Sequence, residues 1–301
     1  MPEDWVGSTT SVHGSGRDGL SRVEDGSLLA NALAAGPEAW LGPGRDNLAL
    51  LVKLLDAGDR LPVHLHPDRA LAREHLGAAC GKTEAWYVVS ADAEEPCVWL
   101  GFAHSVDDAT LADWVERQDV EALLGAMNRV PVSGGDALFV PAGLPHAIGE
   151  GLLICELQEP SDLSVMLEWR DIELDGGDPY LGLGMQGALA ATWRDPVSPE
   201  QMARLREGRG FDEERPGVEQ LLPREADAFF RLERIKPGGS SALPRELSVL
   251  VVLDGEGRLV TEEGDLALRR GNTAIVPWGA GDGVLEGELE VLRCMPPDAE
   301  H

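Results

Sequence analysis

The chain has 301 residues, of which 53 are Asp or Glu and 25 are Lys or Arg, so its formal net charge is −28 at pH 7. This length is enough for one large domain or two smaller ones, each with a sizeable buried core. The negative charge repels nucleic-acid phosphates and anionic membrane surfaces, which excludes both as main partners. An anionic substrate therefore needs a local cluster of positive charge.

The cysteines and the first residues indicate the compartment. The four cysteines form no C-x-x-C pair and show no spacing typical of a disulfide framework, so we expect reduced, partly buried thiols. The opening stretch MPEDWVGS lacks the basic and apolar regions of a signal peptide. The longest apolar stretch, 48–55, contains Lys53 and is too short to span a bilayer. We therefore predict a soluble cytoplasmic protein.

Residues 1–60 have a mixed pattern. SLLANALAA (27–35) predicts a short helix that has Ser27 as its N-cap and ends before Gly36. LALLVKLLDA (48–57) predicts a buried strand, because its apolar run is short and is followed by a turn signal.

Short strands dominate residues 61–170. Glycine and proline separate apolar or alternating runs that predict the strands of a sandwich or barrel: TEAWYVV, CVWLGF, DALFVPAG, LLICELQ and SVMLEW. A helical insertion interrupts them at 107–127, where apolar residues recur at helical spacing. We therefore expect a mainly β region with one helical insertion.

After a helical stretch, the remainder of the chain returns to the pattern of short strands separated by turns. Residues 180–225 carry little strand signal and predict helices and loops, with a capping pattern at Ser198. Strand patterns return at 228–298. DALFVPAGLPH (136–146) resembles NTAIVPWGAGD (272–282), and this internal repeat predicts two related barrels.

Two histidines, His64 and His66, lie two residues apart in LPVHLHPD, in a chain with seven histidines. Alternate side chains of a strand share a face, so these imidazoles point the same way. Glu84 lies in the strand pattern GKTEAWYVV, and a Pro/Gly turn presents His146. Three imidazoles and one carboxylate are a good ligand set for a divalent transition metal. The alternative is a pair of core histidines satisfied by hydrogen bonds. The presence of Glu84 and His146 in matching motifs favours a metal site instead.

These spacings resemble the two motifs of the cupin superfamily, H-x-H followed by Glu, and G-D…P-x-G-x-x-H. The long gap between His66 and Glu84, filled by a predicted helix, resembles one family in particular, the class I mannose-6-phosphate isomerases. The resemblance implies a mainly β fold with two cupin (jelly-roll) barrels and a helical insertion. The matching stretches follow in order along most of the chain: EDWVGS (3–8), LLVKLLDAGDRLPVHLHPD (50–68), GKTEAWYVV (81–89), WLGF (99–102), VPAGLPHAIGEG (140–151) and ELQEPSD (156–162).

Histidine positions distinguish the two expected barrels. The second β-rich region has no histidine before His301, so it cannot repeat the metal site. We therefore predict an N-terminal metal-binding cupin domain at 1–175 and a helical and loop connecting segment at 176–225. A C-terminal degenerate cupin domain without metal follows at 226–301.

The resemblance implies zinc held by His64, His66, Glu84 and His146. It also implies an aldose–ketose isomerisation that interconverts mannose 6-phosphate and fructose 6-phosphate. In that reaction a proton moves between C1 and C2 through an enediol-like intermediate, and the metal stabilises the developing negative charge. The implied partner is a small sugar or sugar phosphate, and the sequence does not indicate an oligomeric state.

Three further residues, Lys82, Glu156 and Asp162, fall on the family's active-site positions. Lys82 is suited to donating a proton or stabilising the enediolate, and it is one of three lysines against 22 arginines. Glu156 and Asp162 are candidates for proton transfer if their surroundings raise their pKa values. The structural alternatives are a salt bridge between Lys82 and Glu84, a solvated Glu156 and a turn-capping Asp162.

Two positions depart from the family pattern. The family usually has glutamine where this chain has His64, so iron, manganese and nickel are alternatives to zinc. The family's active-site arginine falls on Met166, and Arg170 is a candidate substitute because it lies on the same side of a continuous strand. The alternative for Arg170 is surface pairing with Glu168 or Asp171.

These departures leave other functions open. Met166 and the acidity favour an isomerase or epimerase of an unphosphorylated sugar. His64 favours a cupin oxygenase with iron at a three-histidine, one-glutamate site. A sugar-binding protein that retains the fold without activity is a further alternative.

Overall fold

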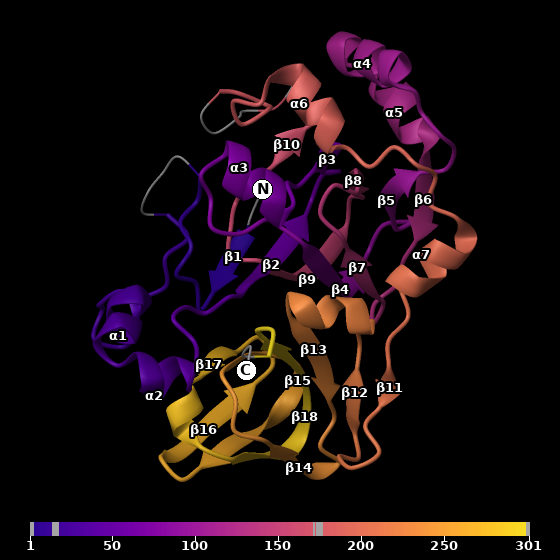
Figure 1. The fold of residues 1–301 in the computed structure, drawn as a ribbon. Coiled ribbons are helices and arrows are strands. Elements are labelled where there is room, and N and C mark those ends of the chain that lie inside the picture. Colours follow the sequence, from indigo (N-terminus) through magenta and orange to yellow (C-terminus); the bar gives the residue numbers. More distant parts are fainter. Residues whose placement is uncertain (1–2, 14–17, 171, 173–176, 299–301) are drawn as a thin grey trace. The chain divides into compact units, whose positions relative to one another are not determined.

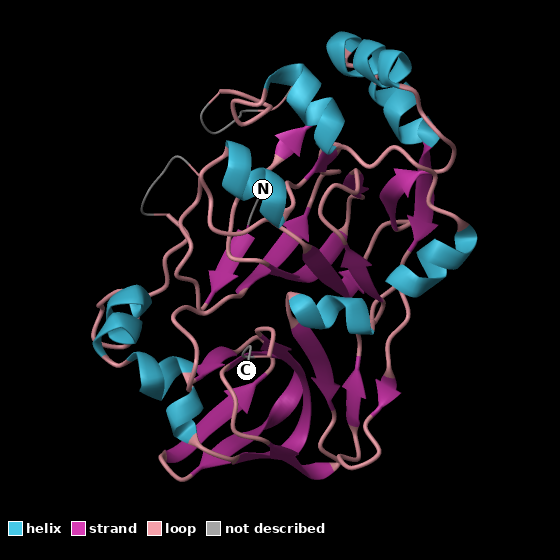
Figure 2. Ribbon diagram, viewed as in Figure 1, coloured by secondary structure: helices cyan, strands magenta, loops and turns pink. Residues whose placement is uncertain are grey.

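The computed structural model describes residues 3–13, 18–170, 172 and 177–298, and strands with surrounding helices make up most of it (Figure 1, Figure 2). The chain divides into two compact units. The first consists of Met1–Asp4, Ser11–Asp18 and Lys53–Arg206, and the second of Trp5–Thr10, Gly19–Val52 and Glu207–His301. The domain boundaries at 175 and 225 remain predictions.

Two five-stranded sheets lie mainly in the first unit, and the pairings described between their strands are antiparallel. In order across the first sheet, the strands are β1 (Glu3–Val6), β2 (Leu51–Ala57), β9 (Leu152–Gln158), β4 (Glu84–Ala91) and β7 (Ala137–Val140). In order across the second, they are β10 (Val165–Met166), β3 (His64–Leu65), β8 (His146–Ile148), β5 (Cys97–Phe102) and β6 (Met127–Pro131).

Both sheets contribute to one core. Trp86 and Ile154 come from the first sheet, Val98 and Leu100 come from the second, and all four lie in one cluster of buried side chains. Trp99, which lies between the last two, packs instead among the helices on the other face, because successive strand residues alternate. The prediction of a mainly β region is therefore confirmed, and its sheets share an apolar interior.

Helices cover the outer face of the second sheet. The predicted insertion at 107–127 is confirmed, but it forms two helices because Gln118 adopts a left-handed conformation (φ 57°) and ends the first. Asp107 and Asp119 cap the N-termini of these helices with their carboxylates. The helices of this unit are α3 (Arg69–His75), α4 (Asp108–Arg117), α5 (Val120–Ala126), α6 (Gly184–Ala191) and α7 (Pro199–Leu205).

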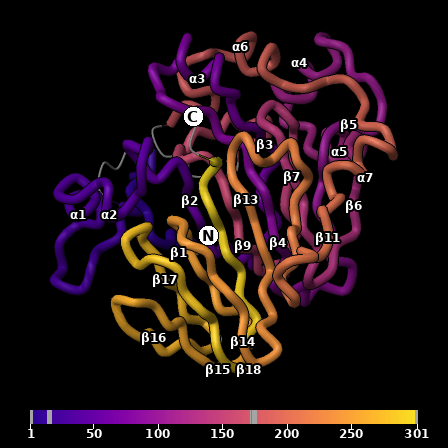
Figure 3. Tube along the Cα trace, turned by 60° about the horizontal axis from the view of Figure 1, so that its bottom comes forward, coloured from indigo at the N-terminus to yellow at the C-terminus, as the bar shows by residue number. Residues whose placement is uncertain are grey.

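The second unit contains an eight-stranded sheet whose two longest strands, β15 (Ser248–Thr261) and β18 (Gly283–Met295), pair along their length (Figure 3). Gly255 allows the close approach, since a Cβ there would lie 1.8 Å from the Glu288 carbonyl oxygen. The remaining strands are β11 (Gly210–Phe211), β12 (Val218–Gln220), β13 (Arg231–Ile235), β14 (Gly239–Leu243), β16 (Gly264–Arg269) and β17 (Thr273–Val276). The helices are α1 (Leu29–Ala35), α2 (Pro37–Leu41), η1 (Arg224–Ala228) and η2 (Trp278–Ala280).

The start of α1 differs from the prediction. Leu28 is its N-cap, without a side-chain hydrogen bond, so the prediction that Ser27 caps this helix is wrong. Ser27 belongs instead to the preceding turn, where its backbone N–H donates to Asp25 Oδ1. This bond from the backbone of Ser27 to the side chain of Asp25, two residues earlier, forms an Asx turn.

The repeated stretches have corresponding local structure. Residues 136–146 contain β7, a turn and the start of β8, and residues 272–282 contain β17 followed by the short helix η2. The four cysteines are free, with Cys97, Cys155 and Cys294 buried. Within the described part of the chain, no helix is long and apolar enough to cross a membrane.

Candidate metal centre

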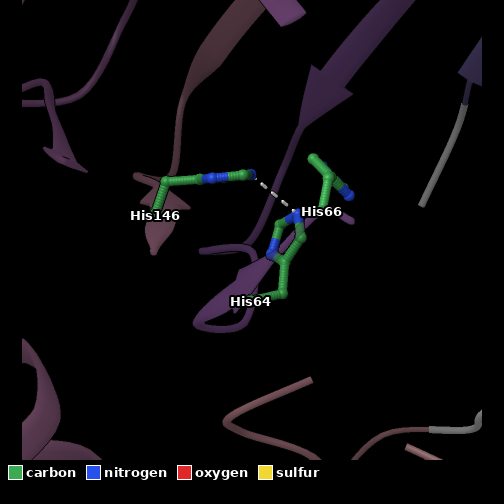
Figure 4. Close-up of side chains that lie close together, drawn as sticks. All are labelled: His64, His66 and His146. Carbon is green, nitrogen blue, oxygen red and sulfur yellow. Dashed lines mark hydrogen bonds between the residues drawn. The ribbon is translucent and has the colours of Figure 1, made fainter. Parts of the chain in front are cut away.

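Three histidine side chains converge in the first unit. His64 begins β3 and pairs in register with His146 at the start of β8, while His66 directly follows β3. One ring nitrogen of each lies within 4.8 Å of those of the other two. The rings point toward one another, with 3.1 Å between Nε2 of His64 and Nε2 of His146 (Figure 4). The structure therefore assembles the three imidazoles that the sequence pattern selected.

Backbone carbonyls determine which nitrogens face the centre of this cluster. The Nδ1 atoms of His64, His66 and His146 each lie 2.8 Å from a carbonyl oxygen, those of Pro62, Leu163 and Leu144 respectively. A carbonyl only accepts hydrogen bonds, so each Nδ1 carries the proton and each Nε2 presents a lone pair. Lone pairs in such proximity repel one another, and a shared cation removes that repulsion. This donor arrangement fits a metal ion.

Burial keeps the three histidines neutral. It lowers the pKa of His64 to about 3, with the neighbouring His146 adding to the effect. It lowers the pKa of His66 to about 4, although the charge of Glu84 acts in the opposite direction. The pKa of His146 falls to about 3 for the same reason. Neutral imidazole is the form that binds metals, so protons do not compete for these ligands at neutral pH.

Glu84 adds a carboxylate to the cluster from the start of β4. Its Oε1 lies 2.9 Å from Nε2 of His66, and its Oε2 lies 3.7 Å from Nε2 of His146. Trp86 Nε1 donates to Oε2 at 3.1 Å and so orients the carboxylate. Burial alone would raise the pKa of Glu84, but its interactions with His66 and with the ammonium group of Lys82 hold it well below its ordinary value. A charged carboxylate therefore adjoins the imidazoles.

His64, His146 and Glu84 of this cluster line a pocket of about 260 Å³. Among the described residues the lining includes two cations, both lysines, and five carboxylates, and it contains no arginine. The full lining is Glu3, His13, Lys53, Leu55, Leu61, Pro62, His64, Lys82, Glu84, His146, Ile148, Glu156, Asp162, Ser164, Met166, Ile172, Asp178 and Leu181. A small polar molecule suits a pocket of this size and lining beside the histidines.

Lys82 lies at the edge of the histidine cluster with only 5% of its surface exposed. Its Nζ is 3.0 Å from Glu84 Oε1 and 3.4 Å from Nε2 of His66. Burial would lower the pKa of Lys82, but the charges of Glu84 and Glu156 outweigh burial and raise it. The salt bridge to Glu84 that was considered as a structural alternative is therefore present, and it keeps an ammonium group in the pocket.

Glu156 is buried in the pocket wall on β9, with 4% of its surface exposed, so the alternative of a solvated glutamate is excluded. Burial raises the pKa of Glu156 to about 8, and repulsion from the charge of Glu84 adds to the rise. A carboxyl group with such a pKa can hold a proton at neutral pH and release it to a neighbour. This property suits a general acid or base.

Asp162 pairs with Lys53, a pocket-lining lysine that sequence reasoning missed. Its Oδ1 lies 3.4 Å from Nζ of Lys53, and its Oδ2 accepts from the backbone N–H of His13 at 3.0 Å. Lys53 also lies 3.4 Å from Glu3 Oε2 and is 2% exposed. The signal was present in the sequence, because a lysine inside the apolar run LALLVKLL is expected to be buried and then needs a carboxylate partner.

Met166 and Arg170, the two positions considered for the family arginine, lie in different environments. Met166 pairs in register with His64 and lines the pocket. Arg170 is exposed and is not among the described lining residues, and its backbone N–H donates to Gln118 Oε1. Glu168, one of its expected surface partners, pairs with Arg60, and Asp171 lies outside the described residues. The structure thus brings together seven of the eight predicted site residues and leaves Arg170 outside.

Curated relatives identify the family. No protein-family model matches the chain. The mannose-6-phosphate isomerase ManA of Bacillus subtilis is 30% identical over 251 residues, which cover 82% of this chain and 75% of the relative. A mannose-6-phosphate isomerase of Streptococcus mutans is 29% identical over 255 residues, covering 81% and 72%. The chain belongs to the mannose-6-phosphate isomerase family, a family of sugar-phosphate isomerase enzymes, and the resemblance is confirmed.

Solved structures show the same fold. The mannose 6-phosphate isomerase of Bacillus subtilis has a TM-score of 0.74 at 24% identity, covering 89% of this chain and 82% of that one. A mannose 6-phosphate isomerase bound with zinc and yttrium has a TM-score of 0.71 at 15% identity, covering 99% and 91%. These likenesses establish the overall fold, and the site residues rest on the geometry above.

Proposed function

We propose that the protein is a metal-dependent aldose–ketose isomerase that interconverts mannose 6-phosphate and fructose 6-phosphate. The observation that carries this proposal is the set of three unprotonated Nε2 atoms beside the carboxylate of Glu84, next to a pocket whose wall contains Glu156 and Lys82. The family membership of the chain supports the same reaction.

His64, His66, Glu84 and His146 would hold the metal. Zinc is the proposed ion, supported by the zinc in a structural neighbour and by a nitrogen-rich ligand set. Iron, manganese and nickel remain alternatives, because three imidazoles and a carboxylate suit each of them. When bound, the ion supplies a positive charge that orients the sugar oxygens and stabilises negative charge that develops on them.

The chain's own residues would move the proton. Glu156 in its charged form takes the proton from C2 of the aldose and returns it to C1, which yields the ketose. The ammonium group of Lys82 stabilises the negative oxygen of the enediol-like intermediate. Asp162, which pairs with Lys53, would exchange the hydroxyl proton that must shift between the two oxygens.

The architecture proposed for this function is two cupin barrels. The sheets of the first unit carry the candidate ligands, and the strand-and-turn repeat at 136–146 and 272–282 supports a related second barrel. We propose the metal-binding domain at 1–175, the connecting segment at 176–225 and the degenerate domain at 226–301. A cytoplasmic location accords with the free cysteines.

A second candidate function is isomerisation of an unphosphorylated sugar. Met166 lines the pocket beside His64, where an apolar side chain cannot bind a phosphate. The two described cations of the lining, Lys53 and Lys82, already lie against carboxylates. A sugar that ends in a hydroxyl group would avoid the repulsion that a phosphate meets there.

A paired assay tests both candidates. Zinc-loaded protein is offered mannose 6-phosphate and free mannose at equal concentration, and the matching ketose is measured. Turnover of the phosphate ester supports the first function, and turnover of free mannose alone supports the second. Neither product from protein that retains its metal would contradict both and favour an oxygenase or a sugar-binding protein.

Restoring the missing charge provides a complementary prediction. Met166→Arg places a guanidinium at the pocket wall, so the preference for phosphorylated over free sugar should increase by about tenfold or more. The ratio of kcat/KM values for the two substrates measures this preference. Met166→Leu is the matched control, because it keeps the apolar wall and should leave the ratio unchanged.

A further inference from the structure

Two carboxylates outside the pocket lie directly behind candidate metal ligands. Glu159 follows β9, and Glu168 follows β10. Their side chains are 2% and 16% exposed, and neither is among the described residues that line the pocket. Substrate chemistry does not explain why two charged groups are withdrawn from solvent at these positions.

Glu159 is bound twice to the residue that precedes Glu84. The backbone N–H of Glu159 donates to the carbonyl oxygen of Thr83 at 3.1 Å, and its carboxylate Oε2 accepts from the backbone N–H of Thr83 at 3.0 Å. Thr83 is 3% exposed, so this N–H has no access to solvent as a substitute partner. The side chain therefore replaces the main-chain carbonyl that would continue the ladder between β9 and β4.

Glu168 makes the same pair of bonds to the residue that precedes His64. Its backbone N–H donates to the carbonyl oxygen of Val63 at 2.9 Å, and its Oε2 accepts from the backbone N–H of Val63 at 2.8 Å. Val63 is fully buried. One local arrangement thus occurs twice, each time one residue before a candidate ligand.

An arginine holds each carboxylate in place. Arg69 donates to Glu159 Oε1 from Nε at 2.5 Å. Arg60 donates to both oxygens of Glu168, at 2.8 Å and 2.5 Å. Charge-assisted hydrogen bonds are shorter and roughly twice as strong as neutral ones. The arginines therefore hold each carboxylate, and with it the hydrogen bond to the residue before the ligand, more firmly than an ordinary bond between strands would.

We propose that Glu159 and Glu168 are positioning residues that hold the backbones of Glu84 and His64 at the spacing the metal requires. This inference rests on the proposed metal site. Without the carboxylate, the buried N–H of Thr83 or Val63 loses its partner, and the strand end shifts to find another. A shift of the backbone moves the following ligand away from the other three.

Metal affinity tests this role directly. Glu159→Ala and Glu168→Ala should each weaken zinc binding by about 10–100-fold, measured by competition with a chromophoric chelator. Glu159→Gln and Glu168→Gln keep an oxygen that can accept from the backbone N–H, so they should retain most of the affinity. The glutamine variants also remain informative if an alanine variant fails to fold.

Glu233→Ala is the matched control. Glu233 is likewise a buried carboxylate paired with an arginine, Arg215, but it lies in the second unit and adjoins no candidate ligand. All three alanine variants should be less stable, whereas only those at 159 and 168 should lose zinc affinity. The absorption spectrum of bound Co²⁺ should change in those two variants and not in Glu233→Ala.

The outcomes separate this inference from the proposed function. If the wild-type protein binds no metal, the proposed function and the positioning role are both overturned. If the wild-type protein binds zinc and the alanine variants at 159 and 168 match Glu233→Ala in affinity and Co²⁺ spectrum, the metal site stands and the positioning role is overturned. Folded glutamine variants as weak as the alanine variants would also overturn it.

Discussion

At the scale of single residues, the candidate site depends on how hydrogen bonds distribute protons. Carbonyl oxygens bind Nδ1 of His64, His66 and His146, so the three Nε2 atoms face the same space unprotonated. Burial lowers their pKa values, while it raises that of Glu156 to about 8. At neutral pH the three histidines are therefore unprotonated at Nε2 and available as metal ligands, while the neighbouring Glu156 can carry a proton.

Removing one imidazole should abolish metal binding. In His146→Ala the ligand set loses a nitrogen, so we expect loss of stoichiometric zinc and a fall in turnover larger than the roughly 10–100-fold typical of residues behind the ligands. Metal analysis of dialysed protein and the isomerase assay measure both. His104→Ala, at an exposed position, should change neither. Stoichiometric zinc in His146→Ala would contradict the ligand assignment.

Glu156 should make the stability of the metal-free protein depend on pH. Its pKa is about 8 in the folded state against an ordinary value of 4.5, so the folded state holds a proton that the unfolded state has released. The resulting stabilisation is full below pH 4.5 and is lost as the pH rises toward 8, by at most about 5 kcal/mol. Urea unfolding between pH 5 and 9 measures it. Glu156→Gln should lack this dependence, and identical curves would contradict the raised pKa.

At the scale of elements, side-chain alternation explains why the ligands meet. His64 and His146 are cross-strand partners of β3 and β8, and Glu84 begins β4 next to Gln158 of β9. The helices beside these strands depend on a residue whose role the sequence did not suggest. Gln118 separates α4 from α5 and binds the segment that follows β10 through its side-chain amide.

Gln118→Ala should therefore loosen the junction between helices and sheet. The side chain donates to the carbonyls of Val115 and Leu167 and accepts from the backbone N–H groups of Trp169 and Arg170. We expect the free energy of unfolding to fall by about 2–3 kcal/mol, measured by urea denaturation. Gln186→Ala, exposed on α6, should cost less than about 0.5 kcal/mol. Equal losses would contradict this role.

At the scale of the whole molecule, the candidate site links metal binding to folding. Buried neutral imidazoles and a buried carboxylate cost free energy when no cation compensates for them. The formal charge of −28 adds general repulsion within the compact state. A cation that binds only the folded chain relieves the local part of this cost.

Zinc should accordingly raise the stability of the folded protein. At a free concentration about 100 times the dissociation constant, we expect a gain of about 2.7 kcal/mol over chelator-treated protein. The pKa values of the histidines lie below their ordinary value of 6.5, so their stabilising contribution is present above pH 6.5 and is lost as the pH falls toward 3–4. Denaturation at pH 7 and pH 5 with and without zinc measures both effects. No gain at pH 7 would contradict the site.

The sequence alone determined the features that depend on local periodicity. The H-x-H spacing, the strand pattern around Glu84 and the turn before His146 predicted a shared ligand site, because strand alternation assigns faces without knowledge of the fold. The same reasoning predicted a mainly β chain with an inserted helical region. The likeness to a family of isomerases was also present in the ordered motifs.

Only the tertiary structure decided which groups from distant segments meet. Some of these contacts join residues about 75 or more apart in the sequence: Lys53 with Asp162, Glu159 with Thr83, and Glu168 with Val63. The exposure of Arg170 depends instead on where the preceding strand ends. Local propensity carries no information on such contacts, since they follow from the register between strands and from burial. For this reason the candidate ligands could be predicted from the sequence, whereas the residues that contact and position them could not.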